Sequence, residues 1–150
     1  MKFIFIAVLA GLVGTAGMTW VLHFITKAGW TNADMVRALG SAVTGSYEKS
    51  KTKGYILHFL IGIPIALIYT VLLSLAPITG IIGTILIGGL IGFVHGFTFS
   101  FILLALAEYH PVEQFREADF QVGIAHIAGH FFYGLLVGAV IGISGYRIVF

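Results

Sequence analysis

The sequence has no cysteine and few charged residues. Of its 150 residues, 9% are Asp, Glu, Lys or Arg and 59% are hydrophobic, and the mean hydropathy is +1.04. The absence of cysteine excludes disulfides, iron–sulfur clusters and thiolate metal sites. A soluble domain carries about a quarter charged residues, so lipid is expected to surround much of this chain. The eight Lys and Arg residues, against six Asp and Glu, form no basic patch of the kind that nucleic-acid binding requires.

Four apolar runs reach the roughly 20 residues that a helix needs to cross a bilayer. They cover approximately residues 3–26, 55–75, 80–107 and 122–145. Each is expected to be helical, because an open strand edge in lipid would leave backbone groups without partners. The first run resembles a signal peptide, but it stays apolar as far as Ile25, so we expect a retained membrane helix. The sequence predicts a single all-α, four-helix transmembrane domain over residues 1–150.

Two long polar connections join these runs. Residues 31–46 begin with Thr31 and carry Asp34 three positions later, a helix-capping pattern, and their apolar side chains fall on one helical face. We therefore expect a short interfacial helix there. Residues 111–120 begin with Pro, a favoured first helical residue, which predicts a second interfacial helix.

The basic residues gather beside the same two connections. They are Lys27, Arg37, Lys49, Lys51, Lys53 and Arg116, whereas the other side of the four spans has only Lys2 and Arg147. The positive-inside rule therefore predicts that the long loops are cytoplasmic and that both termini lie outside.

Short matching segments suggest an internal repeat. Gly11–Gly14 matches Gly89–Gly92 at an offset of 78 residues, and His58–Gly62 matches His130–Gly134 at an offset of 72. The chain is therefore expected to consist of two helical hairpins of the same orientation, a parallel repeat of a kind known in membrane folds. The alternative is coincidence among residue types that are common in membranes.

Glycines recur at every fourth position in the last two runs. They are Gly88, Gly92 and Gly96 in the third run and Gly134, Gly138 and Gly142 in the fourth. This glycine-zipper spacing puts them on one face of each helix, where backbones can approach closely within the chain or between copies. Small residues on such a face could also leave room for a flat cofactor.

Three segments carry a family resemblance. The residues 11–20 (GLVGTAGMTW), 33–41 (ADMVRALGS) and 130–138 (HFFYGLLVG) together resemble small four-helix YagU-like inner-membrane proteins of unknown function. The resemblance covers most of the chain. It implies a multi-pass protein of a bacterial or archaeal plasma (inner) membrane, and no functional residue follows from it.

Ionisable residues concentrate in one segment, EYHPVEQFREADFQVGIAHIAGH, residues 108–130. It holds three Glu, one Asp and three His. The helix directions bring five of the six histidines to the loop end of the bundle, and His95 lies deeper. His126 and His130 are spaced i, i+4, so their rings share one helical face and can bind one metal ion. Imidazole and carboxylate ligands suit zinc, iron, manganese or, less specifically, copper. The predicted metal ligands are His126, His130, Glu108, His58, His110 and His23.

Haem b is the second ligand that the sequence supports. A haem held by two imidazoles needs two histidines at similar depth on facing helices. His58 with His130, which the repeat relates, and His95 with His130 meet this condition. The predicted cofactor-binding residues are therefore His58, His95 and His130.

Other interpretations remain open at this stage. Histidine and glutamate at a membrane–water boundary are often solvated and bind nothing, and proton or ion movement through them is a further alternative. The competing function is an accessory or assembly subunit, or a homo-oligomer, that packs through its glycine faces. The sequence contains no hydrolytic triad, phosphate loop or nucleotide-binding motif, so an enzyme would have to depend on a metal. The sequence does not decide whether the chain is one.

Overall fold

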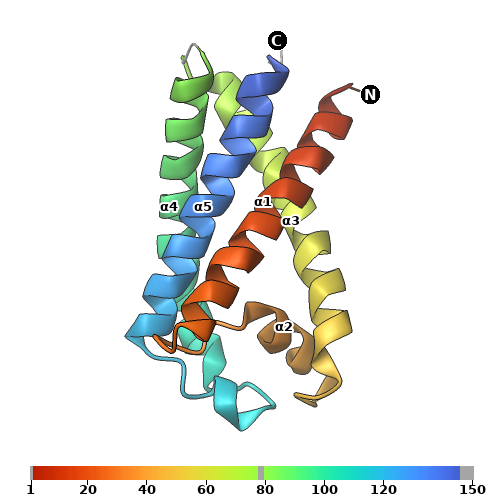
Figure 1. Ribbon diagram of the computed structural model, residues 1–150, viewed down its shortest axis with the longest axis vertical. Helices are drawn as coiled ribbons and strands as arrows, with labels where there is room; N and C mark the ends of the chain where they lie inside the picture. Colours follow the sequence, from red (N-terminus) through yellow and green to blue (C-terminus); the bar gives the residue numbers. More distant parts are fainter. Residues whose placement is uncertain (1, 78–79, 146–150) are drawn as a thin grey trace.

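The computed structural model describes residues 2–77 and 80–145, and these are all-helical, as predicted. The helices are α1 (Lys2–Lys27), α2 (Met35–Thr44), α3 (Ser50–Leu75), α4 (Ile81–Ala107) and α5 (Phe120–Ser144), with a 3₁₀ turn, η1 (Glu113–Phe115). The four long helices are long and apolar enough to cross a membrane. They run up and down, so that the start of α1 and the end of α5 lie at one end and α2 with η1 at the other (Figure 1).

The first long connection forms a helix, although its cap differs from the predicted one. Asp34, rather than Thr31, is the N-cap of α2, and its carboxylate accepts a hydrogen bond from the backbone N–H of Arg37 at 3.0 Å. The helix ends at Gly45, whose φ of 63° is in the left-handed region that glycine adopts without strain. Local sequence therefore determines both ends of α2.

The second long connection contains only the turn η1 instead of the predicted helix over 111–120. The side chain of His110 accepts a hydrogen bond from the N–H of Val112 at 3.1 Å, and Arg116 Nε donates to the His110 carbonyl at 2.6 Å. These bonds fold the segment back on itself. Asp119 then caps α5 by accepting from the N–H groups of Gln121 and Val122.

Glycine permits the most extensive contact between helices, which is that of α4 with α5. A methyl group on Gly92 would lie 3.0 Å from the carbonyl carbon of His130, and one on Gly134 would lie 2.9 Å from the carbonyl carbon of Gly88. Real side chains essentially never approach backbone atoms this closely, so only glycine fits. Close approach replaces the hydrophobic driving force that lipid does not provide.

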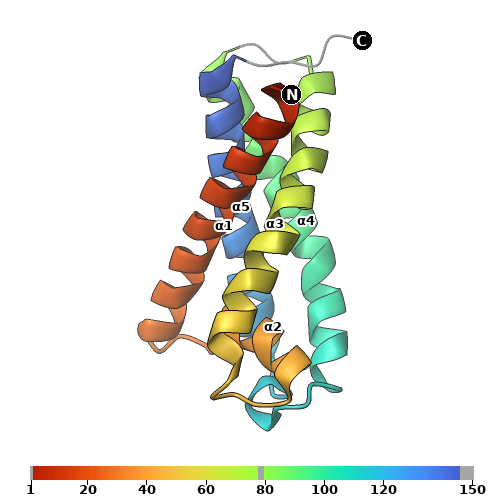
Figure 2. The same cartoon turned by 90° about the vertical axis from the view of Figure 1, so that its right-hand side faces the viewer.

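Helix α1 packs against both α3 and α5. Gly11 of α1 lies against α3, where an added methyl group would be 2.9 Å from the Cα of Ile63. Gly14 of α1 lies against the ring of Tyr133 on α5. In contrast, α3 and α4 contact each other little along their length: they cross in the view of Figure 2 and lie on opposite sides of the bundle at the loop end in Figure 1. Side chains of these two helices therefore face a shared space rather than each other.

Candidate functional site

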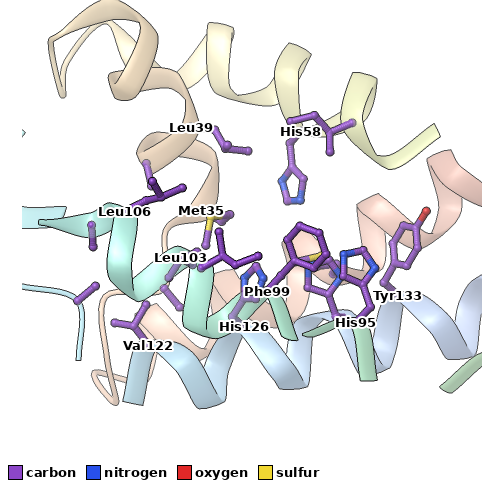
Figure 3. Close-up of a pocket in the computed structure, with 18 of the residues that line it drawn as sticks. Met35, Leu39, His58, His95, Phe99, Leu103, Leu106, Val122, His126 and Tyr133 are labelled. Atoms are coloured by element: carbon purple, nitrogen blue, oxygen red, sulfur yellow. The ribbon is translucent and has the colours of Figure 1, made fainter. Parts of the chain in front are cut away.

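A cavity of about 1200 Å³ lies between α3 and α4, with α5 behind it and α2 at its loop end (Figure 3). Most side chains that line it are apolar, such as Met35, Leu39, Ile65 and Leu103. Five histidines also line the cavity: His110 at its loop end, and His58, His95, His126 and His130 deeper in the bundle. An apolar pocket with a few converging polar groups is the usual form of a ligand site.

His58 extends from α3 into the cavity, toward the wall that carries His95 and His126 (Figure 3). Its Nδ1 lies 3.4 Å from the hydroxyl oxygen of Thr19 on α1. The Thr19 hydroxyl itself donates to the carbonyl of Thr15 at 2.7 Å. A hydroxyl has only one proton, so the Thr19 oxygen accepts here and His58 Nδ1 carries the hydrogen. The other nitrogen of the neutral ring, Nε2, therefore keeps its lone pair.

His95 lies on α4 and is hydrogen-bonded to a buried phenol. Its Nδ1 is 3.0 Å from the hydroxyl of Tyr69 on α3. This hydrogen bond joins α3 to α4 and fixes the orientation of the His95 ring.

His126 and His130 lie on α5 one helical turn apart, as their i, i+4 spacing predicted. Their ring centroids are 4.5 Å apart, and the His130 ring stacks on His95 at 4.3 Å. Each residue is 7% exposed. Three of their ring nitrogens are buried without a hydrogen-bond partner: both nitrogens of His126 and the Nδ1 of His130. An unpaired buried polar group costs about 1–3 kcal/mol, so these nitrogens favour a ligand that would satisfy them.

Three of the sequence-predicted ligands lie apart from the other four histidines, although one of them, His110, also lines the cavity. Both nitrogens of His110 bond to the backbone: Nδ1 accepts from Val112 and Nε2 donates to the Ala38 carbonyl at 3.0 Å. His23 and Glu108 are exposed side chains and do not line the cavity. The structure therefore brings together His58, His95, His126 and His130.

The described residues contain no group of three His, Asp or Glu side chains close enough to hold a metal ion. The His126–His130 pair and the facing His58 thus line opposite walls of one cavity and do not form a closed coordination shell.

Two supporting residues were missed by the sequence analysis. Tyr69 lies eleven positions after His58, which is about three helical turns, so its place on the same face of α3 was readable. Thr19 acts across helices, from α1 to α3, and no sequence spacing indicates that contact.

Comparisons of the chain with protein-family models, with curated proteins and with solved structures find no match. The functional argument therefore depends on the residues of the site and their geometry.

Proposed function

We propose that this chain is a multi-pass plasma-membrane protein that binds a transition metal through imidazole nitrogens in the cavity between α3 and α4. The ligands would be His58 from one wall, with His130 and His126 from the other. The metal arrives either as a free ion or as the iron of haem, since both are coordinated by neutral imidazole.

The observation that carries this proposal is the set of buried ring nitrogens without partners on His126 and His130. In folded proteins the large majority of buried side-chain polar atoms are hydrogen-bonded. Two such rings in contact, on the wall of an apolar cavity, are therefore costly unless something binds them. Polar groups held inside a membrane bundle are generally functional for the same reason.

His58 adds a second argument. Histidines that bind a metal usually donate the hydrogen of their other nitrogen to a nearby oxygen, which fixes the tautomer and the ring orientation. The Thr15–Thr19–His58 chain of hydrogen bonds supplies this arrangement, with Nε2 left as the metal-binding atom.

We further propose that the chain consists of two related hairpins, α1 with α3 and α4 with α5. The contact of Gly11 with the backbone at Gly62 and that of Gly88 with Gly134 support this pairing. The long loops would be cytoplasmic, as the basic residues beside them indicate, and α2 would lie at the membrane surface.

The alternative role of an accessory subunit has less support. Gly88, Gly92, Gly134 and Gly138 already lie against backbone atoms of the same chain, so these faces are used within the fold. The exposed helix surfaces are large aliphatic and aromatic side chains, which suit lipid.

Elemental analysis of the purified protein, with its absorption spectrum, tests the proposal. We expect stoichiometric zinc, iron, manganese or copper, and loss of that metal when His126 and His130 are both changed to Ala. His23→Ala is the matched control, because this imidazole is exposed and outside the cavity; it should keep the metal. Unchanged metal in the double variant would refute the ligand assignment.

A further inference from the structure

We infer that the metal is bound as haem, with His58 and His130 as the two axial ligands. This inference rests on the proposed function and makes it more specific. The first reason is the size of the cavity. At about 1200 Å³ it exceeds the roughly 300–1,000 Å³ typical of pockets for whole organic ligands, and it is far larger than an ion needs. A compact ion site also requires several ligands close together, and the described residues contain no such group of three.

The two imidazoles face the cavity from opposite walls at similar depth. His58 is eight residues from the start of α3 and His130 ten residues from the start of α5, so they lie about 12 and 15 Å along their own helices at 1.5 Å per residue. His58 presents Nε2 with its lone pair. In the His130 ring, Nδ1 is the nitrogen that is buried without a hydrogen-bond partner. Nε2 is therefore the nitrogen that His130 can present to the cavity.

The contacts of His95 exclude it from the axial pair. Its ring stacks on His130 with centroids 4.3 Å apart and an interplanar angle of 29°, so no porphyrin can lie between them. His95 instead fixes the plane of the His130 ring from the side, and it is itself held by Tyr69.

The opening of the cavity suits a flat, lipid-soluble molecule such as haem. On α3, Ile68 and Leu72 line the cavity and are also exposed, and on α4 the same is true of Leu90 and Val94. The opening between these helices therefore faces hydrocarbon when the chain is in a membrane. An apolar molecule can enter from the bilayer, whereas a hydrated ion cannot.

The loop end of the cavity suits the carboxylate groups of haem. Asn32 and Gln114 line it there and can donate hydrogen bonds. Three acidic residues are also in the lining: Asp34 accepts from the N–H of Arg37, Asp119 caps α5, and Glu117 is exposed. The carboxylate groups of the haem would therefore point toward the loops, and its apolar porphyrin ring would lie inside the bundle.

The experiment fills the cavity without touching the imidazoles. Ile91 lies on the cavity side of α4, and Ile91→Trp should exclude a porphyrin. Ile82→Trp is the matched control, since Ile82 is on the same helix, 74% exposed and not part of the lining. Ile65→Trp fills the cavity from α3 and is a second, independent variant in case Ile91→Trp does not fold. Purified proteins are titrated with haemin and their haem and total metal are measured.

We expect stoichiometric haem with a low-spin spectrum in the wild type and in Ile82→Trp, and loss of haem in both cavity-filling variants and in His58→Ala or His130→Ala. Metal without porphyrin, unaffected by Ile91→Trp, would overturn the haem inference and leave the proposed function standing. Haem that persists in His58→Ala and His130→Ala would overturn the axial assignment. A wild-type protein that binds neither haem nor metal would overturn both proposals.

Discussion

At the scale of single residues, the tautomer of His58 is the key chemical feature of the cavity. It is set by two threonines on another helix: Thr15 accepts the only proton of Thr19, so Thr19 must accept from His58. A ring held in this way presents a lone pair to the cavity. His126, whose two ring nitrogens have no partner, has no tautomer set in this way.

Thr19 should therefore affect ligand binding although it does not touch the ligand. Thr19→Val keeps the side-chain volume and removes the hydrogen-bond acceptor, so we expect metal or haem affinity to fall about ten- to hundredfold, the usual effect of losing an oxygen that orients a metal-binding histidine. Thr19→Ser keeps the hydroxyl and should bind nearly as tightly as wild type. Titration of the apo protein measures both. Equal affinities for the two variants would show that Thr19 does not orient His58.

The sequence predicted the members of this site only in part. The i, i+4 spacing of His126 and His130 placed them on one face correctly, and the helix directions brought His58 to the same end. Glu108 and His110 were grouped with these histidines because both residues are close to the loop end. The positions of those side chains depend on how the 108–119 segment folds back, which local spacing does not encode.

At the scale of helices, the α4–α5 contact positions His130. The backbone of His130 lies against Gly92, and its Cβ lies against Gly96, so the helix pair holds the point at which the imidazole is attached. The fourfold glycine spacing predicted a close face on each helix. It could not predict that the two faces would meet each other within one chain, because the same spacing also serves contacts between copies.

Adding one methyl group at this contact should destabilise the fold. In Gly134→Ala the new Cβ would lie 2.9 Å from the Gly88 carbonyl carbon and 3.0 Å from the Gly92 Cα, which is too close for backbone atoms. We expect a loss of about 1–3 kcal/mol in the free energy of unfolding, the typical cost of overpacking, measured by denaturation in detergent micelles.

Gly123→Ala is the control on the same helix. Its Cβ would meet only Leu104 at 3.4 Å and Ser100 at 3.8 Å, which are ordinary contacts. Because alanine is the better helix former by about 0.5–1 kcal/mol, this variant should be as stable as wild type or slightly more stable. A Gly134→Ala protein as stable as Gly123→Ala would contradict the assigned α4–α5 contact.

At the scale of the whole molecule, apolar run length predicted the architecture well. All four spans were found, and their ends differ from the predicted ones by at most a few residues except at the start of α3. That helix begins at Ser50 rather than near 55, because Gly54 lies against the backbone of α2 at Val36 and extends the helix beyond its apolar stretch. The cavity was not predictable, since it depends on α3 and α4 staying apart.

We expect the distribution of charge to set the orientation in the membrane. With α2 and η1 at one end and the start of α1 and the end of α5 at the other, a cytoplasmic position of the basic loops would put the termini outside. An alkaline phosphatase fused after the C-terminus should be active, and a green fluorescent protein at the same point should be dark. The same two reporters inserted after Glu48 should give the opposite result. A fluorescent C-terminal fusion would reverse the proposed topology.

The central claim is that imidazoles from opposite walls of one cavity bind one metal, and the metal content of the purified chain tests it most directly. The wild type should contain or take up a stoichiometric metal, as an ion or as haem iron, and the variant with both His58 and His130 changed to Ala should contain none. A folded wild-type protein that takes up no metal, or a double variant that keeps it, would contradict the account.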